Sequence, residues 1–247
     1  MTGADKIYLV VPARNEEKRI AATLMDYLQF FPQLHLVVVL TKCSDNTEGV
    51  VKDIQAKFPQ RLEYITAPPV AGNSKGQAVR YGLEYVWCNY QPQWLGFIDA
   101  DNSVSPTEFN KLWQGRDGFD VVISSRYLPD SYLKERDSFL RIIASYLFRK
   151  IVQLLFGLPW QDTQCGGKIY RGERLAIFLD KLQINDMTFD VEMLYYCQKY
   201  GLKVKEVPIV WRENIASTIS TSPWAFLLTS WQMFWSLLLL RIRFWQE

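Results

Sequence analysis

The chain has 247 residues, of which 49% are hydrophobic and 22% charged, so it can form a substantial core and is too apolar for general disorder. Its 28 Lys plus Arg and 26 Asp plus Glu leave a net charge of +2, which gives no support for nucleic-acid binding. The four cysteines form no CxxC pair and His35 is the only histidine, which argues against a zinc site and is typical of the reducing cytoplasm.

Short apolar runs alternate with longer amphipathic stretches through the first half of the chain. The short runs predict strands at residues 7–11, 36–40, 62–65, 95–98 and 121–124. The stretches between them predict helices over residues 16–30, 47–58, 75–90 and 106–113. Nearly continuous apolar strands separated by helices predict an α/β fold, with a Rossmann-like, mostly parallel sheet covered by helices on both faces.

The pattern changes after Tyr127. Residues 138–156 predict a helix with a broad apolar face, and we interpret Arg149 and Lys150 as its solvated side. The remaining segments predict a loop over 157–168, a short strand around Ile169, a helix over 187–200 and a strand over 204–209.

Residues 223–240 are nearly all apolar. As a helix these 18 residues would span about 27 Å, slightly less than the ~30 Å hydrocarbon core of a bilayer. Four polar interruptions and several aromatic residues favour a helix lying in the membrane interface, with Arg241, Arg243 and Trp245 at the lipid headgroups. A buried core helix or a dimer contact is the alternative.

The acidic triplet Asp99-Ala100-Asp101 follows the strand predicted at 95–98. Ligands of open α/β sheets bind at the carboxyl ends of the strands, so both carboxylates are expected in that crevice. There they can hold Mg²⁺ or Mn²⁺ together with the phosphate oxygens of a diphosphate. Taken alone, the triplet suits a solvated turn and helix cap before Pro106 equally well.

Two other polar segments come next to predicted strands. In VVPARNEE, after the first strand, Asn15 and Glu16 can hydrogen-bond a ribose or base, although Glu16 and Glu17 also suit a first helical turn. GNSKGQAVRYG opens the third helix, where Lys75 and Arg80 can meet phosphate. An ordinary loop is the alternative for this second segment.

Six segments, in order, resemble the GT-A glycosyltransferases of family 2: VVPARNEE, SKGQAVRYG, FIDADNSVSP, SSRY, DTQCGGK and FDVEMLYYCQKYGLKVKEVPIVWRE. The chain is most similar to the branch of dolichyl-phosphate glucosyltransferases and polyprenyl-phosphate mannosyltransferases. This resemblance, which extends to about Glu213, implies a metal-dependent, inverting transferase. Such an enzyme moves a hexose from a nucleoside-diphosphate sugar, of the UDP-glucose or GDP-mannose type, to a polyprenyl or dolichyl phosphate at the membrane surface.

The resemblance also implies the residues of the site. It makes Asp99 and Asp101 the ligands of Mg²⁺ or Mn²⁺. It gives the nucleotide sugar a pocket made of Pro12, Ala13, Arg14, Asn15, Glu16, Lys75, Asp99, Ala100 and Arg212. It gives catalytic roles to Asp101, Arg126, Asp162 and Gln164, and an acceptor phosphate to Arg126, Arg136 and Arg141.

One departure from the family pattern concerns the second strand. In such enzymes it usually ends in an Asp-Asp or Asp-Asn pair, whereas Leu40 and Thr41 stand at those positions here. That removes a usual contact to the nucleotide and leaves the base, uracil or guanine, open.

Two other functions stay open. A transferase acting on a glycolipid or soluble acceptor would need a catalytic base, for which Asp162 and Asp190 are candidates, although Asp190 also suits a helix cap. The second alternative is a non-catalytic sugar-nucleotide-binding protein.

The organisation expected is a glycosyltransferase domain over residues 1–212 and an apolar C-terminal region over 213–247. Within the domain, the donor half covers about 1–125 and the acceptor half about 126–212. We expect the protein in the cytoplasm, attached peripherally to the membrane through C-terminal helices. The sequence leaves a homo-oligomer open.

Overall fold

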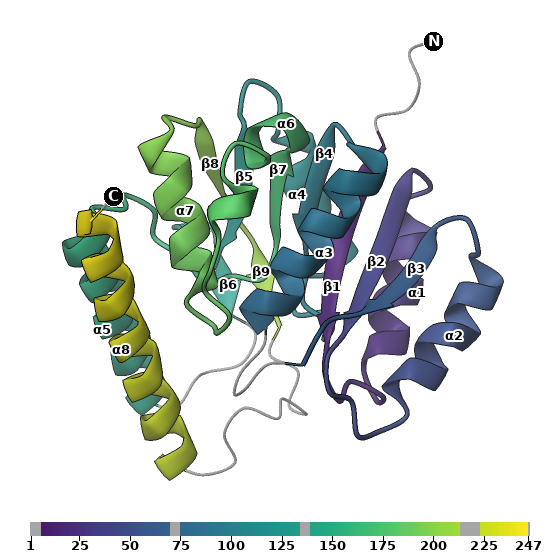
Figure 1. Ribbon diagram of the computed structural model, residues 1–247, viewed down its shortest axis with the longest axis horizontal. Helices are drawn as coiled ribbons and strands as arrows, with labels where there is room; N and C mark the ends of the chain where they lie inside the picture. The colour runs from purple at the N-terminus through teal and green to yellow at the C-terminus, as the bar shows by residue number, and fades with distance from the viewer. Residues whose placement is uncertain (1–5, 70–74, 134–138, 213–222, 247) are drawn as a thin grey trace.

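The computed structural model contains a seven-stranded sheet (Figure 1). It describes residues 6–69, 75–133, 139–212 and 223–246. The side chains of 139–141, 223–230 and 246 are not described. The strand order is β3-β2-β1-β4-β7-β5-β8. The strands are β1 (Ile7–Ala13), β2 (Leu34–Leu40), β3 (Leu62–Thr66), β4 (Trp94–Phe97), β5 (Val121–Ser125), β7 (Lys168–Arg171) and β8 (Val204–Pro208). A separate parallel pair joins β6 (Tyr132–Leu133) to β9 (Val210–Trp211).

Neighbouring strands of the large sheet run parallel, except that β7 is antiparallel to both β4 and β5. The sheet is therefore mostly parallel, as predicted. Because β7 runs in the opposite direction, the loop before Lys168 reaches the edge of the sheet at which β4 and β5 end. This is how residues 162–167 come close to the segments that follow those two strands.

Helices cover both faces of the sheet, because alternate side chains of each strand point in opposite directions. The helices are α1 (Ile20–Phe30), α2 (Thr47–Lys57), α3 (Lys75–Tyr90), α4 (Pro106–Gln114), α5 (Phe139–Phe156), α6 (Gly172–Leu175), α7 (Phe189–Lys199) and α8 (Pro223–Gln246), with a 3₁₀ turn at Leu179–Lys181. Leu9 and Val11 of β1 belong to the core shared with α1, α2 and α4, whereas Val10 belongs to the core shared with α3 and α7.

The predicted elements of the first half are all present, and α3 has the predicted limits. The largest difference is the start of α1, which begins at Ile20 rather than at residue 16. The N–H groups of Arg19 and Ile20 both donate to the carbonyl of Glu16, at 2.9 Å, so residues 16–19 form a turn. The prediction that Glu16 and Glu17 lie in a first helical turn is therefore wrong.

Helices α5 and α8 lie side by side at one end of the molecule, next to α7 (Figure 1). Leu240 and Phe244 of α8 are buried, and Phe244 stacks on Tyr195 of α7 with 3.7 Å between ring centroids. Arg243 donates to Glu192 of α7 at 2.8 Å. These contacts fix the C-terminal part of α8 to the rest of the protein. None of the helices, as far as their residues are described, is both long and apolar enough to cross a membrane.

Candidate active site

The polar segments predicted to form a site meet at one edge of the sheet, where β1, β4 and β5 end. The strand order reverses direction between β1 and β4, and such switch points open a crevice for ligands. Asn15 after β1 and Asn102 after β4 both have φ of 58°. Asn tolerates this left-handed conformation better than most residues do, which allows both chains to turn sharply at the crevice.

Asp99 and Asp101 lie in the turn after β4. Lys75 Nζ lies 2.6 Å from Asp99 Oδ1, and Asp101 Oδ1 accepts a hydrogen bond from the N–H of Ser103 at 3.0 Å. Burial raises the pKa of Asp101, and the negative charge of Asp99 raises it further. Burial alone would lower the pKa of Lys75, but the carboxylates of Asp99 and Asp190 outweigh it and raise this pKa.

The pair of carboxylates fits a divalent cation. Two half-buried groups of like charge repel each other, and a cation between them relieves that repulsion. Their oxygens are the hard ligands that Mg²⁺ and Mn²⁺ prefer, and Mg²⁺ is commonly held by one or two carboxylates together with substrate phosphates. Within the described ranges, no cluster of three or more Asp, Glu, His or Cys side chains is placed to hold a metal.

The turn that carries the two carboxylates is fixed from both sides. Thr23 and Tyr27 of α1 donate from their hydroxyl groups to the carbonyls of Ala100 and Val104, at 2.8 and 2.7 Å. The N–H of Arg212 donates to the carbonyl of Ser103 at 3.1 Å. The backbone of Arg212 therefore lies beside the turn, and its side chain is exposed.

The predicted nucleotide segment after β1 is tied to the loop after β2. Ser44 donates from its N–H to Asn15 Oδ1, and Glu16 donates from its N–H to Thr47 Oγ1, each at 2.8 Å. Of the other predicted residues in this segment, Pro12 is half-buried, Ala13 is buried and Arg14 is exposed.

Glu16, a carboxylate of this segment, is influenced by the negative charges of the turn after β4. Burial raises its pKa to about 7, against the lowering effect of Arg19, whose Nη2 lies 2.6 Å from Glu16 Oε2. The negative charges of Asp101 and Asp99 add to the increase. The segments after β1 and β4 therefore share one electrostatic environment.

The end of β2 carries no acidic pair. Thr41 is buried there, and its N–H donates to the carbonyl of Ala13 at 3.0 Å. The next carboxylate, Asp45, accepts hydrogen bonds from the Thr47 hydroxyl at 2.6 Å and the Glu17 N–H at 3.1 Å. Asp45 therefore holds two loops together.

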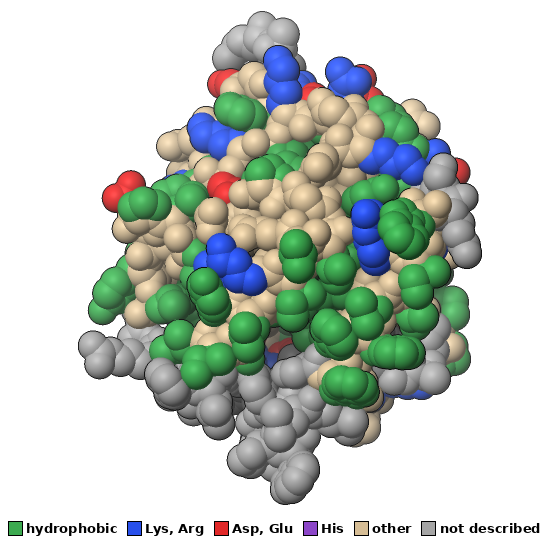
Figure 2. Space-filling model, turned by 90° about the vertical axis from the view of Figure 1, so that its left-hand side faces the viewer, with side chains coloured by type: hydrophobic (Ala, Val, Ile, Leu, Met, Phe, Trp, Pro, Cys, Tyr) green, Lys and Arg blue, Asp and Glu red, His purple; other side chains and the backbone are tan. Residues whose placement is uncertain are grey.

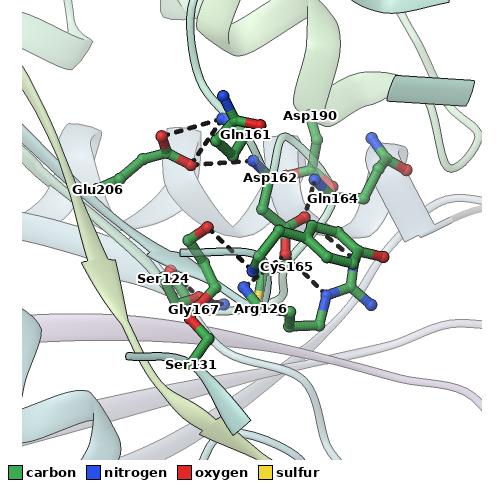
Figure 3. Close-up of polar contacts among 12 residues, drawn as sticks. Ser124, Arg126, Ser131, Gln161, Asp162, Gln164, Cys165, Gly167, Asp190 and Glu206 are labelled. Atoms are coloured by element: carbon green, nitrogen blue, oxygen red, sulfur yellow. Dashed lines mark hydrogen bonds and ion pairs between the residues drawn. The ribbon is translucent and has the colours of Figure 1, made fainter. Parts of the chain in front are cut away.

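A second polar cluster lies after β5 and is drawn in Figure 3. Arg126 donates to Asp162 three times, from the backbone N–H and Nε to Oδ2, at 3.0 and 2.7 Å, and from Nη2 to Oδ1 at 3.0 Å. Glu206 of β8 accepts the N–H groups of Gln161 and Asp162, both at 2.9 Å. Burial alone would raise the pKa of Asp162, but the adjacent Arg126 guanidinium outweighs it and lowers this pKa. The loop 162–167 is thus held firmly at its first residue.

Gly166 brings the two clusters together. A Cβ built on Gly166 would lie 2.1 Å from Asp99 Oδ2, so the loop backbone packs directly on this carboxylate. Only a glycine permits so close an approach. At the next residue, the Gly167 N–H donates to the Ser124 hydroxyl at 3.2 Å, which fixes the loop to β5.

We expect Gly166→Ala to reduce turnover about 100-fold, because the added methyl must displace the Asp99 carboxylate and misplacements of about 1 Å can cost this much. Turnover and thermal unfolding would be measured together. Gly167→Ala is the matched control: the atoms nearest to its Cβ would be the Ser124 hydroxyl at 3.1 Å and the two methyl groups of Val104. Equal activity of the two variants would contradict the prediction.

A buried ion pair lies behind this loop. Lys168 is fully buried, and its Nζ lies 2.5 Å from Asp190 Oδ1 and 2.6 Å from the carbonyl oxygen of Cys165. The residue that caps α7 is Thr188, so the interpretation of Asp190 as a helix cap is wrong. Burial raises the pKa of Asp190, and Lys168 and then Lys75 oppose this. Burial also raises the pKa of Cys165 to about 11, so its thiol is protonated and suits a packing role.

An apolar cavity of about 510 Å³ lies between α5 and α8, beside Arg126. Its wall is formed mainly by apolar side chains of the two helices: Ala144, Leu147, Phe148, Ile151, Trp231, Met233, Phe234 and Leu237. Its polar lining consists of Arg126, Tyr127, Ser145, Arg149, Asp162, Thr163 and Gln164. Catalytic residues predicted on the acceptor side therefore line a space suited to an apolar ligand with one polar end.

Arg149 faces this cavity, which corrects its interpretation as part of a solvated helix side. Its guanidinium lies over the Tyr127 ring, 3.7 Å from the centroid, and the side chain is half-buried. A sequence signal for this was present. Arg149 precedes the buried Val152 by three residues and Phe156 by seven, a spacing that puts all three on one helix face. Lys150 is exposed, as predicted.

Arg80, Arg136 and Arg141 are the other cations that the sequence predicts near a phosphate. Arg136 and the side chain of Arg141 lie outside the described residues. Arg80, considered for phosphate binding, donates to the carbonyl of Leu182 at 2.8 Å and to Asn185 at 3.3 Å. It therefore supports the segment before α7.

A Rossmann-like sheet with a carboxylate pair at its switch point fits the class of GT-A glycosyltransferases, and comparisons with known proteins agree. A model of the family described as Glycosyltransferase like family 2 matches residues 4–131. A dolichyl-phosphate beta-glucosyltransferase of Dictyostelium discoideum is 30% identical over 227 residues, which cover 85% of this chain and 68% of that protein. Polyprenol monophosphomannose synthase of Mycolicibacterium smegmatis is 26% identical over 209 residues, 83% of this chain and 77% of that protein.

The fold is also similar to a solved structure of glucosyl-3-phosphoglycerate synthase from Mycobacterium tuberculosis, in complex with Mn²⁺, uridine-diphosphate-glucose and phosphoglyceric acid. The TM-score is 0.68 at 20% sequence identity, over 96% of this chain and 80% of that one. The chain belongs to glycosyltransferase family 2. This confirms the resemblance carried by the motifs and identifies the protein as a glycosyltransferase.

Proposed function

We propose that the enzyme transfers a hexose from a nucleoside-diphosphate sugar to a polyprenyl phosphate, with inversion, in a single displacement. An oxygen of the acceptor phosphate forms a bond to the anomeric carbon while the bond from that carbon to the diphosphate oxygen breaks. The products are a glycosyl phospholipid and the nucleoside diphosphate. The observation that carries this proposal is the apolar cavity, whose polar end lies on the same loop that packs against Asp99.

On the donor side, Asp99 and Asp101 would hold Mg²⁺ or Mn²⁺. When bound there, the metal supplies positive charge that stabilises the departing diphosphate. Lys75, which already lies against Asp99, adds a cation at the same place. We expect the segment from Pro12 to Glu16 to contact the nucleoside.

On the acceptor side, a phosphate is already ionised at neutral pH and needs no general base. The properties of the carboxylates on the acceptor side are consistent with an acceptor that needs no base. The pKa of Asp162 is lowered, which makes it a poor base, and both of its oxygens accept hydrogen bonds from Arg126. Asp190 is buried in its pair with Lys168. Both features favour a phosphate acceptor over a hydroxyl acceptor, which would have to lose a proton.

A lipid acceptor is favoured by the outer face of α5 and α8. Figure 2 shows this face, where hydrophobic side chains gather with Lys and Arg among them. Most of the exposed large hydrophobic side chains among the described residues belong to these two helices, including Ile142, Tyr146, Leu147, Leu154, Trp231, Trp235, Leu239, Ile242 and Trp245. We propose that this face lies on a membrane surface. The four free cysteines suit a reducing compartment, so we place the protein on the cytoplasmic side.

The membrane proposal predicts that the double variant Trp235→Glu, Ile242→Glu binds vesicles about 100-fold more weakly. Both side chains are about half exposed, at 53% and 54%, and each would lose roughly 1.5 kcal/mol of apolar burial in the lipid. Co-flotation with vesicles of phosphatidylcholine and phosphatidylglycerol measures this. Ile177→Glu, at an exposed apolar position outside the two helices, is the control and should bind as the wild type does. Unchanged flotation of the double variant would rule out this face.

The proposed reaction is tested by a matrix of donors and acceptors. UDP-glucose and GDP-mannose would each be offered with polyprenyl phosphate, polyprenol, a glycolipid and 3-phosphoglycerate, with Mn²⁺, Mg²⁺ or EDTA. We expect turnover with polyprenyl phosphate only, and its loss in EDTA. Transfer to polyprenol or the glycolipid would support a hydroxyl acceptor. Donor binding without turnover on any acceptor would favour the non-catalytic alternative.

A further inference from the structure

We infer that Arg149, together with Thr163 and Gln164, forms the subsite for the phosphate of the acceptor. This inference rests on the proposed function and assigns its acceptor headgroup to named residues. The three residues come from separate parts of the chain, since Arg149 belongs to α5 and the other two to the loop before β7. All three line the same apolar cavity.

The first observation is a set of unsatisfied polar atoms. Arg149 Nε, Thr163 Oγ1 and Gln164 Nε2 are each buried and without a hydrogen-bond partner in the part of the chain that the structure describes. Each of them can donate a hydrogen bond. Buried donors are seldom left unpaired, because doing so costs the desolvation of the group. Three such donors around one cavity indicate a ligand rich in acceptor oxygens.

The second observation is the charge at this end of the cavity. Among the described residues, its charged lining consists of Arg126, Arg149 and Asp162, which together carry one net positive charge. Arg126 directs Nε and Nη2 at Asp162, so its charge is compensated within the protein. Among the described residues, no carboxylate pairs with Arg149. An anion in the cavity would therefore meet a charge at Arg149 that no described carboxylate compensates.

The third observation concerns the orientation of Arg149. Its guanidinium lies over the Tyr127 ring at 3.7 Å, and such stacking holds the planar group in one place while leaving its N–H edge available. Arg binds phosphate oxygens through that edge. Tyr127 therefore acts as a positioning residue for Arg149.

The rest of the cavity decides which phosphate is bound. Leu147, Ile151 and Phe234 line it, and a free phosphate or a sugar phosphate would leave these side chains against water. A phosphate attached to an isoprenoid chain fills both parts, with its headgroup at Arg149 and its first prenyl units between α5 and α8. The ligand class is thus a prenyl monophosphate.

The test uses the full chain and three probes: farnesyl phosphate, farnesol and inorganic phosphate. Binding is followed by calorimetry and by intrinsic tryptophan fluorescence, to which Trp231 in the cavity lining contributes. For the wild type we expect farnesyl phosphate to bind at least about 10-fold more tightly than farnesol. Arg149→Met should weaken farnesyl phosphate binding about 10- to 100-fold, as expected for the loss of a charge-assisted contact, and change farnesol binding less than twofold.

Steady-state kinetics give a second readout. Arg149→Met should raise the KM for polyprenyl phosphate by a similar factor and leave the KM for the nucleotide sugar unchanged. Arg149→Lys should restore part of the affinity, since it retains the charge without the planar fork. Thr163→Val should shift binding in the same direction by a smaller factor. Lys150→Met, at the exposed neighbouring position, is the control and should match the wild type.

Wild-type binding of farnesyl phosphate by both Arg149→Met and Thr163→Val would overturn the subsite. Inorganic phosphate binding as tightly as farnesyl phosphate would overturn the assignment to a prenyl phosphate. The proposed reaction fails separately, if the wild type transfers sugar to no lipid phosphate, and the binding comparison still decides the subsite in that case.

Discussion

Replacing Asp101 by Ala should abolish hexose transfer, with turnover at least about 1,000-fold below that of the wild type. Asp101 and Asp99 form the carboxylate pair at the switch point of the sheet, and Asp101 is itself fixed by the N–H of Ser103. Removing one of two metal ligands removes positive charge from the place where negative charge develops on the leaving diphosphate. Losses of this kind are among the largest that single substitutions cause.

Two readouts make this prediction specific. Mn²⁺ binding, followed by electron paramagnetic resonance, should weaken in Asp101→Ala along with turnover, while circular dichroism and the melting temperature stay close to wild type. Asp53→Ala removes an exposed carboxylate of α2 and should change none of these quantities. Wild-type turnover in Asp101→Ala would show that the pair does not serve the reaction.

The second large effect concerns stability. Lys168→Met should lower the free energy of unfolding by roughly 3–5 kcal/mol, because it leaves the buried carboxylate of Asp190 without its cation. Urea unfolding measures this change. Lys111, whose side chain is 47% exposed in its pair with Glu108, serves as the control, and Lys111→Met should cost less than about 1 kcal/mol.

A double variant distinguishes the effect of breaking the ion pair from the effect of substituting a buried residue. Lys168→Met combined with Asp190→Leu replaces both charges by apolar groups, and such replacements are often close to neutral. We therefore expect it to recover most of the lost stability. If the double variant is as unstable as the sum of the two single variants, the ion pair is not the source of the effect.

Much of the fold could be predicted because its signals are local. The short apolar strands and the helices between them alternate with clear periodicity, and α3 was found with its predicted limits. The start of α1 could not be placed, because the turn at Glu16 is held by a hydrogen bond from the Glu16 N–H to the hydroxyl of Thr47, which is 31 positions away in the chain. The antiparallel direction of β7 could not be predicted either, because the sequence of a four-residue strand does not indicate which strands it will pair with.

The residues of the candidate site also fall into two groups: some follow from local sequence patterns, and others depend on contacts between distant segments. Asp99, Asp101, Arg126 and the loop around Asp162 follow strands or lie in motifs, so the sequence located them. The orientation of Arg149 depends on the packing of α5 against α8. Similarly, the burial of Lys168 beside Asp190 depends on where β7 and α7 meet. Such contacts between distant segments decide whether a charged residue is solvated or buried.

The antiparallel strand β7 also limits how the chain can be divided into fragments or exchanged between relatives. It comes from the half of the chain predicted to bind the acceptor, yet it lies between β4 and β5, which belong to the half predicted to bind the donor. A fragment ending near residue 131, where the family match stops, would lack β7 and β8, so that β4 would lose one of its partners and β5 both of them. The two halves are therefore interleaved rather than modular. Exchanging acceptor specificity between relatives by grafting whole halves should yield insoluble chimaeras, whereas exchanging only α5, α8 and the loop 162–167 leaves the sheet intact.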